Sequence, residues 1–182
     1  MAILKIARLG HPVLRKPAKP VPVGEILAAE TQRLIDDLIE TMREYDGAGL
    51  AANQVHTLEQ ICVIEVLENP RYPDAPLIPL TVVINPVVTP LGDEMEEGWE
   101  GCLSVPDLRG MVERYTAVRL QCYDRQGQHV DLIAKEFFAR VIQHETDHLN
   151  GIVYLDRMRD LSTLAHTAEW NKHWLGIREQ AD

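Results

Sequence analysis

The stretch QHETDHLNG, residues 143–151, constrains the fold most, because it places two histidines four residues apart with a glutamate beside the first. Residues four apart lie on one face of an α-helix. On a helix, this H-E-x-x-H pattern supplies two metal ligands and a carboxylate that can activate a water molecule. Residues 135–150 predict such a helix, about four turns long, and Gly151 is suited to close it as a left-handed residue.

This helix is predicted to bury the face that carries the histidines. Two adjacent rows at helical spacing form that face: Phe137, Val141, His144 and His148, and then Phe138, Ile142, Glu145 and Leu149. The polar residues fall on the far side: Glu136, Arg140, Gln143 and Asp147. A carboxylate among apolar neighbours needs a compensating charge or a raised pKa. A divalent cation would supply that charge to Glu145.

The third metal ligand has to come from elsewhere in the chain. A lone buried histidine is more often a hydrogen-bonded core residue, but the complete pattern favours a catalytic metal site, which usually has three protein ligands. The downstream candidates, none of which fits the longer metzincin pattern, are Asp156, Asp160, His166, Glu169 and His173. Upstream, Cys102 lies in a glycine-containing segment and is a competent ligand. Cys62 and Cys122 lie in strand patterns and are typical of core cysteines.

The other segments predict further helices, strands and loops. An amphipathic helix is expected over residues 24–47, with an apolar stripe of Leu27, Leu34, Leu38, Met42 and Tyr45. Strands are expected at residues 61–67 and 80–88, and a glycine-turn hairpin joins residues 117–124 to 129–134. Residues 47–55, 68–79 and 90–110 are interpreted as loops. A final helix is expected at about 161–180, with Ser162 as its N-cap.

Length and charge narrow the class of protein. The chain of 182 residues fits a single domain, residues 1–182. Its net charge of −10 argues against specific DNA binding, and three widely spaced cysteines argue against a disulfide framework. We identify no signal peptide and no apolar run long enough for a bilayer. A cytoplasmic protein without a membrane partner, or one of an organelle matrix, is therefore expected.

Three motifs together resemble those of the peptide deformylase family: GAGLAANQ at 47–54, EGCLS at 100–104 and QHETDHLNG at 143–151. Their order and approximate spacing agree with the family, and the resemblance covers nearly the whole chain. It implies an α+β fold, with mixed or antiparallel sheets around the central helix that carries H-E-x-x-H. It also implies a hydrolase that removes the N-formyl group from N-formylmethionyl nascent chains and releases formate.

The resemblance assigns roles to individual residues. Glu145 would take a proton from the metal-bound water and pass it to the leaving amine. Gln54 and the backbone N–H of Leu103 would bind the formyl oxygen. The metal ligands would be Cys102, His144 and His148.

Substrate binding is implied at a second set of positions. The backbone of Ala48 and Gly49 would pair with the peptide as an added strand, and Arg109 would lie near the substrate backbone. Phe137 and Val141 are candidates for the methionine pocket. Arg114 would pair with Glu100 and so support the metal-binding segment.

The identity of the metal and the reaction class leave alternatives. The ligands alone favour zinc, whereas the resemblance implies one Fe2+ per chain, replaceable by Zn2+, Ni2+ or Co2+. One alternative is a metallopeptidase that cuts internal peptide bonds, and another is a binding domain with a structural metal site. A transient ribosome contact through the C-terminal segment is a further expectation. The mixed charges of Arg178, Glu179 and Asp182 are not typical of a strong RNA-binding tail.

Overall fold

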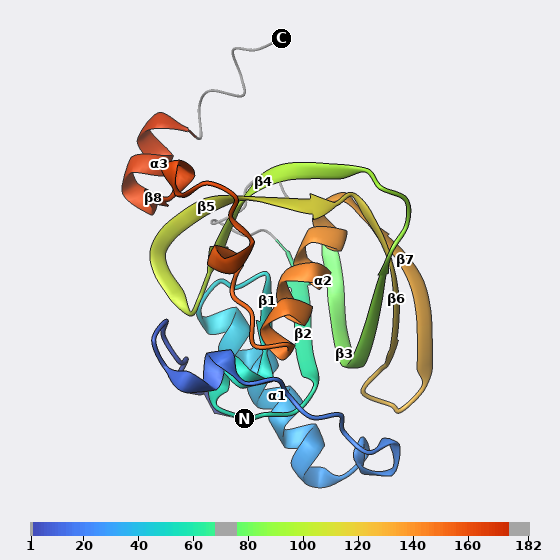
Figure 1. Ribbon diagram of the computed structural model, residues 1–182. Coiled ribbons are helices and arrows are strands. Elements are labelled where there is room, and N and C mark those ends of the chain that lie inside the picture. Colours follow the sequence, from blue (N-terminus) through green and yellow to red (C-terminus); the bar gives the residue numbers. More distant parts are fainter. Residues whose placement is uncertain (1, 68–75, 175–182) are drawn as a thin grey trace.

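The computed structural model describes residues 2–67 and 76–174 (Figure 1). Its strands are β1 Gly49–Ala51, β2 Ile61–Val66, β3 Ile78–Pro90, β4 Met95–Cys102, β5 Val105–Tyr115, β6 Ala117–Tyr123, β7 His129–Lys135 and β8 Ala165–His166. Its α-helices are α1 Ala29–Glu44, α2 Glu136–Leu149 and α3 Thr167–His173. Short 3-10 turns cover Pro12–Arg15, Val23–Glu25, Ala52–Val55, Tyr154–Arg157 and Leu161–Thr163.

The strands form two antiparallel sheets around α2. One sheet has the strand order β1-β2-β3-β6-β7, and the other has the order β4-β5-β8. Helix α2 lies in the middle of the molecule and contacts strands of both sheets (Figure 1). The α+β architecture expected from the sequence, with sheets around the H-E-x-x-H helix, is therefore confirmed.

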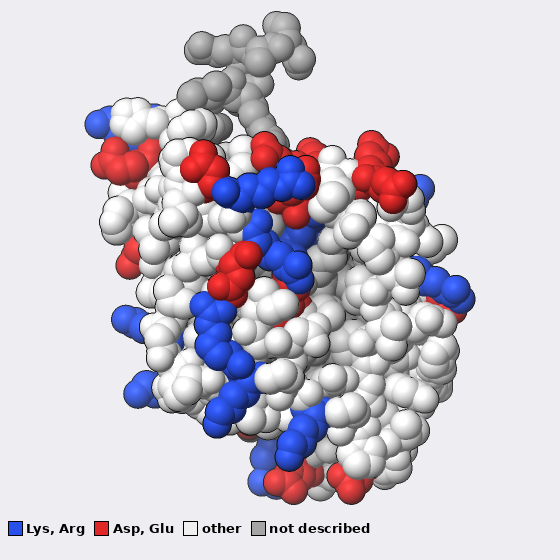
Figure 2. All heavy atoms as spheres, in the orientation of Figure 1, with Lys and Arg blue, Asp and Glu red and all other residues white. Residues whose placement is uncertain are grey.

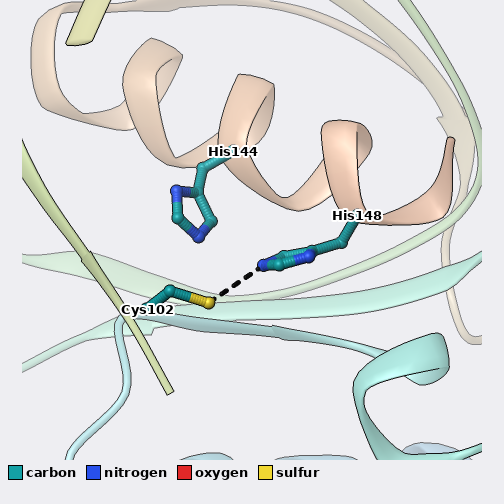
Figure 3. A group of neighbouring side chains, drawn as sticks. All are labelled: Cys102, His144 and His148. Atoms are coloured by element: carbon teal, nitrogen blue, oxygen red, sulfur yellow. Dashed lines mark hydrogen bonds between the residues drawn. The ribbon is translucent and has the colours of Figure 1, made fainter. Parts of the chain in front are cut away.

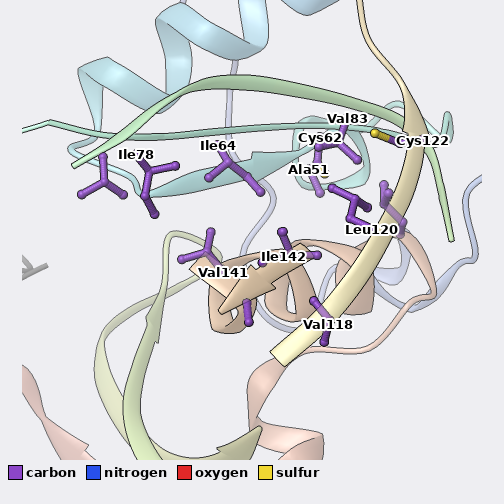
Figure 4. Close-up of a cluster of buried hydrophobic side chains, with 14 of the residues drawn as sticks. Ala51, Cys62, Ile64, Ile78, Val83, Val118, Leu120, Cys122, Val141 and Ile142 are labelled. Atoms are coloured by element: carbon purple, nitrogen blue, oxygen red, sulfur yellow. The ribbon is translucent and has the colours of Figure 1, made fainter. Parts of the chain in front are cut away.

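The five-stranded sheet is covered on both faces. The side chains of β2 alternate: Cys62 and Ile64 join the core cluster with Val141 and Ile142 of α2 (Figure 4), while Val63 faces the cluster of α1. Every residue of β2 is buried for this reason, which explains why its sequence is apolar at every position except Glu65. Burial of one such aliphatic side chain contributes about 1.5–3 kcal/mol, so this sandwich anchors α2 rigidly.

Two predicted loops are strands, and these predictions were wrong. Residues 90–110 contain β4 and the first half of β5, and residues 47–55 contain β1 and a 3-10 turn. The first three residues of β4, Met95, Glu96 and Glu97, are exposed, and the two glutamates and the nearby glycines give the segment a loop-like composition. Its backbone nevertheless pairs with β5 along its whole length.

Both predicted terminal helices are shorter than expected. Helix α1 begins at Ala29, so Leu27 lies outside it and is exposed, as is Tyr45 at its C-cap. The final helix begins at Thr167, because Leu161–Thr163 forms a 3-10 turn capped by Asp160 rather than by Ser162. The rest of the predicted helix, residues 175–180, lies outside the described residues, as do Arg178, Glu179 and Asp182.

Charge is unevenly distributed on the face shown in Figure 2. Acidic side chains gather at the upper end of this face, and basic side chains form a band left of its centre. Within residues 2–67 and 76–174, no helix combines the length and the apolarity needed to cross a membrane.

The end of α2 gives a test of the fold. Gly151 has φ +76°, and a Cβ atom there would lie 2.8 Å from the carbonyl carbon of Arg15. We expect Gly151→Ala to lower the free energy of unfolding by about 1–2 kcal/mol for the left-handed backbone and by about 1–3 kcal/mol more for the clash. Urea denaturation of the metal-free protein measures this loss.

Gly92→Ala is the matched control. Gly92 has φ +82°, but a Cβ atom there would have no heavy atom within 4 Å. It should therefore show the backbone cost alone. Equal losses for the two variants would contradict the close contact between Gly151, at the end of α2, and the backbone of Arg15.

Candidate active site

A pocket lies between the edge strands of the two sheets. Strand β1 pairs only with β2, and β4 pairs only with β5 among the described strands, so each presents an edge to the pocket. The β1 side contributes Gly47, Ala48, Gly49 and Gln54; the β4 side contributes residues 99–103; and α2 contributes Phe137, Arg140, Val141, His144 and Glu145. Most of the residues predicted from the sequence to bind metal or substrate, or to act in catalysis, therefore line this pocket.

Cys102, His144 and His148 form a compact ligand group in this pocket (Figure 3). Their ligand atoms lie within 4.8 Å of one another, and Cys102 Sγ lies 3.2 Å from His148 Nε2. One thiolate and two imidazoles are suitable ligands for zinc and other divalent transition metals. The residues present therefore fit a metal ion, with three protein ligands.

Electrostatics around Cys102 favour its ionised form. Burial alone would raise the pKa of this thiol, but the neighbouring His148 and His144 hold it well below its ordinary value. The thiolate is the form of cysteine that binds a metal. By contrast, burial raises the pKa of Cys62 well above its usual range and that of Cys122 to about 11, as expected for core cysteines.

Glu100 orients the ring of His144. Its carboxylate lies 2.8 Å from His144 Nδ1, which leaves Nε2 for the metal. Arg114 donates two hydrogen bonds to Glu100, of 2.9 and 3.0 Å, and Arg140 donates a third, of 3.0 Å. Although burial would raise the pKa of Glu100, Arg114 and His144 hold it well below its ordinary value.

The sequence did not lead us to predict that Arg140 and Asp147 belong to the ion-pair network around His144. Asp147 is buried and binds Arg114 and Arg157, so the side of α2 that was predicted to lie opposite the buried face packs on β4 and β5. Arg140 and Asp147 lie four residues before and three residues after His144, a spacing that places all three on one side of a helix. That signal was available in the sequence.

Glu145 is a buried carboxylate inside the pocket. It is 3% exposed, and burial raises its pKa to about 7. Its Oε2 atom has no hydrogen-bond partner among the described residues. A Cβ atom on Gly49 would lie 2.4 Å from Glu145 Oε1, so glycine is required there for the carboxylate to keep its position.

Of the other predicted site residues, Gln54 and Leu103 line the pocket beside Cys102, whereas Arg109 does not. Gln54 Nε2 lies 3.1 Å from Ser104 Oγ and 3.5 Å from Cys102 Sγ, while its Oε1 accepts a hydrogen bond from the Ala51 N–H. Leu103 lines the pocket beside Cys102. Arg109 is not among the residues that line the pocket; its guanidinium lies 4.3 Å over the ring of Trp170.

Comparison with known proteins identifies the family. Residues 3–163 match the family described as polypeptide deformylase. The chain belongs to the polypeptide deformylase family. Peptide deformylase 1 of Bordetella pertussis is 48% identical over 162 residues, which cover 89% of this chain and 91% of that protein. Peptide deformylase 1 of Nitrosomonas europaea is 46% identical over 165 residues, covering 91% and 93%.

Solved deformylase structures have the same fold. A class I type b peptide deformylase from Acinetobacter baumannii with bound Met-Ala-Ser superposes with a TM-score of 0.83 at 40% identity, covering 86% of this chain and 99% of that chain. The enzyme from Thermotoga maritima has a TM-score of 0.77 at 34% identity, covering 88% and 100%. The predictions of the family, of the fold class and of an enzyme of the hydrolase class are therefore confirmed.

Replacement of Cys102 tests the ligand group of this deformylase. We expect Cys102→Ser to reduce bound metal from about one ion per chain to a small fraction of that, because a hydroxyl is a poor ligand beside two imidazoles. Metal content per folded chain, measured by plasma mass spectrometry, gives the result. Cys122→Ala, at a cysteine equally buried but outside the group, should retain the metal. Full metal content in Cys102→Ser would contradict the assignment.

Proposed function

We propose that this deformylase removes the N-formyl group from the formylmethionine of nascent polypeptides and releases formate. The observation that carries this proposal is that Cys102, His144 and the buried carboxylate of Glu145 line one pocket, with His148 beside them in the same ligand group. Hydrolysis of an amide needs a nucleophile, a proton carrier and a site for the growing negative charge on oxygen. Each of these has a candidate group in the pocket.

Cys102, His144 and His148 would hold the metal of this enzyme. A divalent cation bound there would supply positive charge that lowers the pKa of a water molecule and polarises a carbonyl group. We propose ferrous iron as the native ion from the family resemblance, with zinc, nickel or cobalt as replacements. Metal analysis of protein prepared without oxygen distinguishes iron from these three.

Glu145 is proposed to move the proton. Its unpartnered Oε2 atom is available to accept a proton from the attacking water and to deliver it to the amine of methionine as the C–N bond breaks. A carboxylate held among apolar groups is well suited to accept and return a proton near neutral pH. The close approach of Gly49 keeps this carboxylate in the pocket.

Gln54 and Leu103 are proposed to stabilise the formyl oxygen. The side-chain amide of Gln54 already points toward Cys102 Sγ, and the backbone N–H of Leu103 is the next donor along the chain. An aligned donor of this kind contributes about 10²–10³ in rate.

The peptide is proposed to bind as an extra strand at the edge of β1. Ala48 and Gly49 line the pocket there, and an edge strand offers backbone groups to any peptide sequence. Phe137 and Val141 would contact the methionine side chain, and Arg109 is retained as a candidate contact near the substrate backbone. Met-Ala-Ser, bound in the Acinetobacter baumannii structure, is the peptide that deformylation of formyl-Met-Ala-Ser would leave.

The two alternative functions have less support. A metallopeptidase of the zincin type takes its third ligand from downstream, whereas the ligand group here includes Cys102, upstream of the helix. A closed structural site has four protein ligands, and the group found among the described residues has three.

Glu145→Gln tests the proposal, because it removes the base and keeps the shape that packs against Gly49. We expect formate release from formyl-Met-Ala-Ser to fall by about 10²–10⁴-fold, with the metal content unchanged. Formate is measured with a coupled dehydrogenase on protein prepared without oxygen. Wild-type protein that binds metal and releases no formate would contradict the proposed function, and an active Glu145→Gln variant would contradict the role of Glu145.

A further inference from the structure

All three tryptophans of the chain lie in one cluster beside the pocket. Trp99 of β4 lies with its ring centroid 6.1 Å from that of Trp170 in α3 and 5.3 Å from that of Trp174, the C-cap residue of α3. Aromatic pairs at such distances stabilise one another beyond their buried area. Helix α3 therefore packs directly on a residue of the pocket wall.

Trp99 and Glu100 point to opposite faces of β4. Neighbouring residues of a strand point to opposite faces: Glu100 contacts His144 and Arg140 of α2, whereas Trp99 contacts α3. Trp99 is half-buried and still lines the pocket. It lies three residues before Cys102, which corresponds to about 10 Å along the strand.

That separation places Trp99 beyond the reacting group. An extended peptide also covers about 10 Å in three residues. A substrate with its formyl group at Cys102 would have the first residue after methionine about two residue lengths along the peptide, which brings that side chain to within about one residue length of Trp99. An indole ring offers such side chains a broad apolar face.

Helix α3 is held in place by the second sheet. Strand β8 pairs with β5 through Arg109 and Ala165. The guanidinium of Arg109 covers the ring of Trp170, which is only 8% exposed. Residues 167–173 of α3 lie after the matched family region, which ends at residue 163. In the ribbon view α3 lies beside β5 and β8, at one end of the second sheet (Figure 1).

We propose that Trp99 is a specificity-determining contact for the residue after formylmethionine, which favours an apolar side chain, and that Trp170 is the positioning residue that holds Trp99 against the pocket. This inference rests on the proposed function for the orientation of the peptide. It assigns α3 a role in the choice of substrate, separate from the chemistry at Cys102 and Glu145.

The test measures peptide binding without turnover. In metal-loaded Glu145→Gln protein, we expect formyl-Met-Leu-Ser to bind roughly three- to ten-fold more tightly than formyl-Met-Ala-Ser by calorimetry, as partial burial of the larger side chain predicts. Trp99→Ala should abolish this preference and Trp170→Ala should reduce it. Trp170→Phe, which keeps an aromatic ring, should retain most of it.

A double-mutant comparison tests whether Trp170 acts by positioning Trp99 or by a general effect on the structure of the protein. If Trp170 acts through Trp99, Trp170→Ala should have no further effect on the preference in a Trp99→Ala background. A preference that survives Trp99→Ala, a further loss on adding Trp170→Ala, or no binding of either peptide would overturn the inference.

The reaction itself is tested independently with formyl-methionine amide, which has no residue after methionine. Failure of metal-loaded protein with native Glu145 to release formate from it would contradict the proposed function. A leucine preference that depends on Trp99 would still support the peptide contact in that case. Wild-type and Trp170→Ala protein should release formate from this short substrate at equal rates, while Trp170→Ala loses the leucine preference. That result would support both the proposed function and the role of Trp99 in substrate choice.

Discussion

The buried pairing of Glu100 with Arg114 links the three-stranded sheet to the helix that carries the histidines. Arg114 also binds Asp147 of α2, and Glu100 also binds His144 and Arg140 of the same helix. Buried charges are stable only when each is paired, and the loss of one partner typically costs about 3–5 kcal/mol. The network therefore favours one alignment of β4, β5 and α2. In that alignment Cys102 meets the two histidines.

The same alignment creates the proposed peptide site. It sets the edge of β4 opposite the edge of β1, with α2 between them, so the pocket has backbone edges on two sides and the ligand group in its wall. Exposed strand edges readily pair with other chains, and here that tendency would serve substrate binding. Because backbone groups are common to all peptides, discrimination between peptides would come from side chains of the pocket wall, such as the proposed contacts Trp99 and Phe137.

The sequence predicted the parts of the molecule that depend on local patterns. Helix α2 followed from its apolar spacing, and β6 and β7 followed from their glycine turn. Cys102 was a candidate ligand from the residues alone, and the family resemblance assigned it that role. Strands β4 and β5 were missed because the acidic residues around Glu96 resemble a loop. The contact of Trp99 with Trp170 was missed because it joins distant segments without any local signal. Asp147 was misjudged because residues 90–110, which form β4 and part of β5 beside α2, had been predicted to be a loop.

The metal affinity of Glu100→Gln tests most directly whether this buried network builds the site. Zinc affinity, measured by competition with a chromophoric chelator, should fall about 10- to 100-fold, as is usual when the residue that orients a histidine ligand is replaced. Asp131→Asn, which breaks the exposed pair of Asp131 with Arg119 away from the pocket, should leave the affinity unchanged. Unchanged affinity in a folded Glu100→Gln variant would contradict the account.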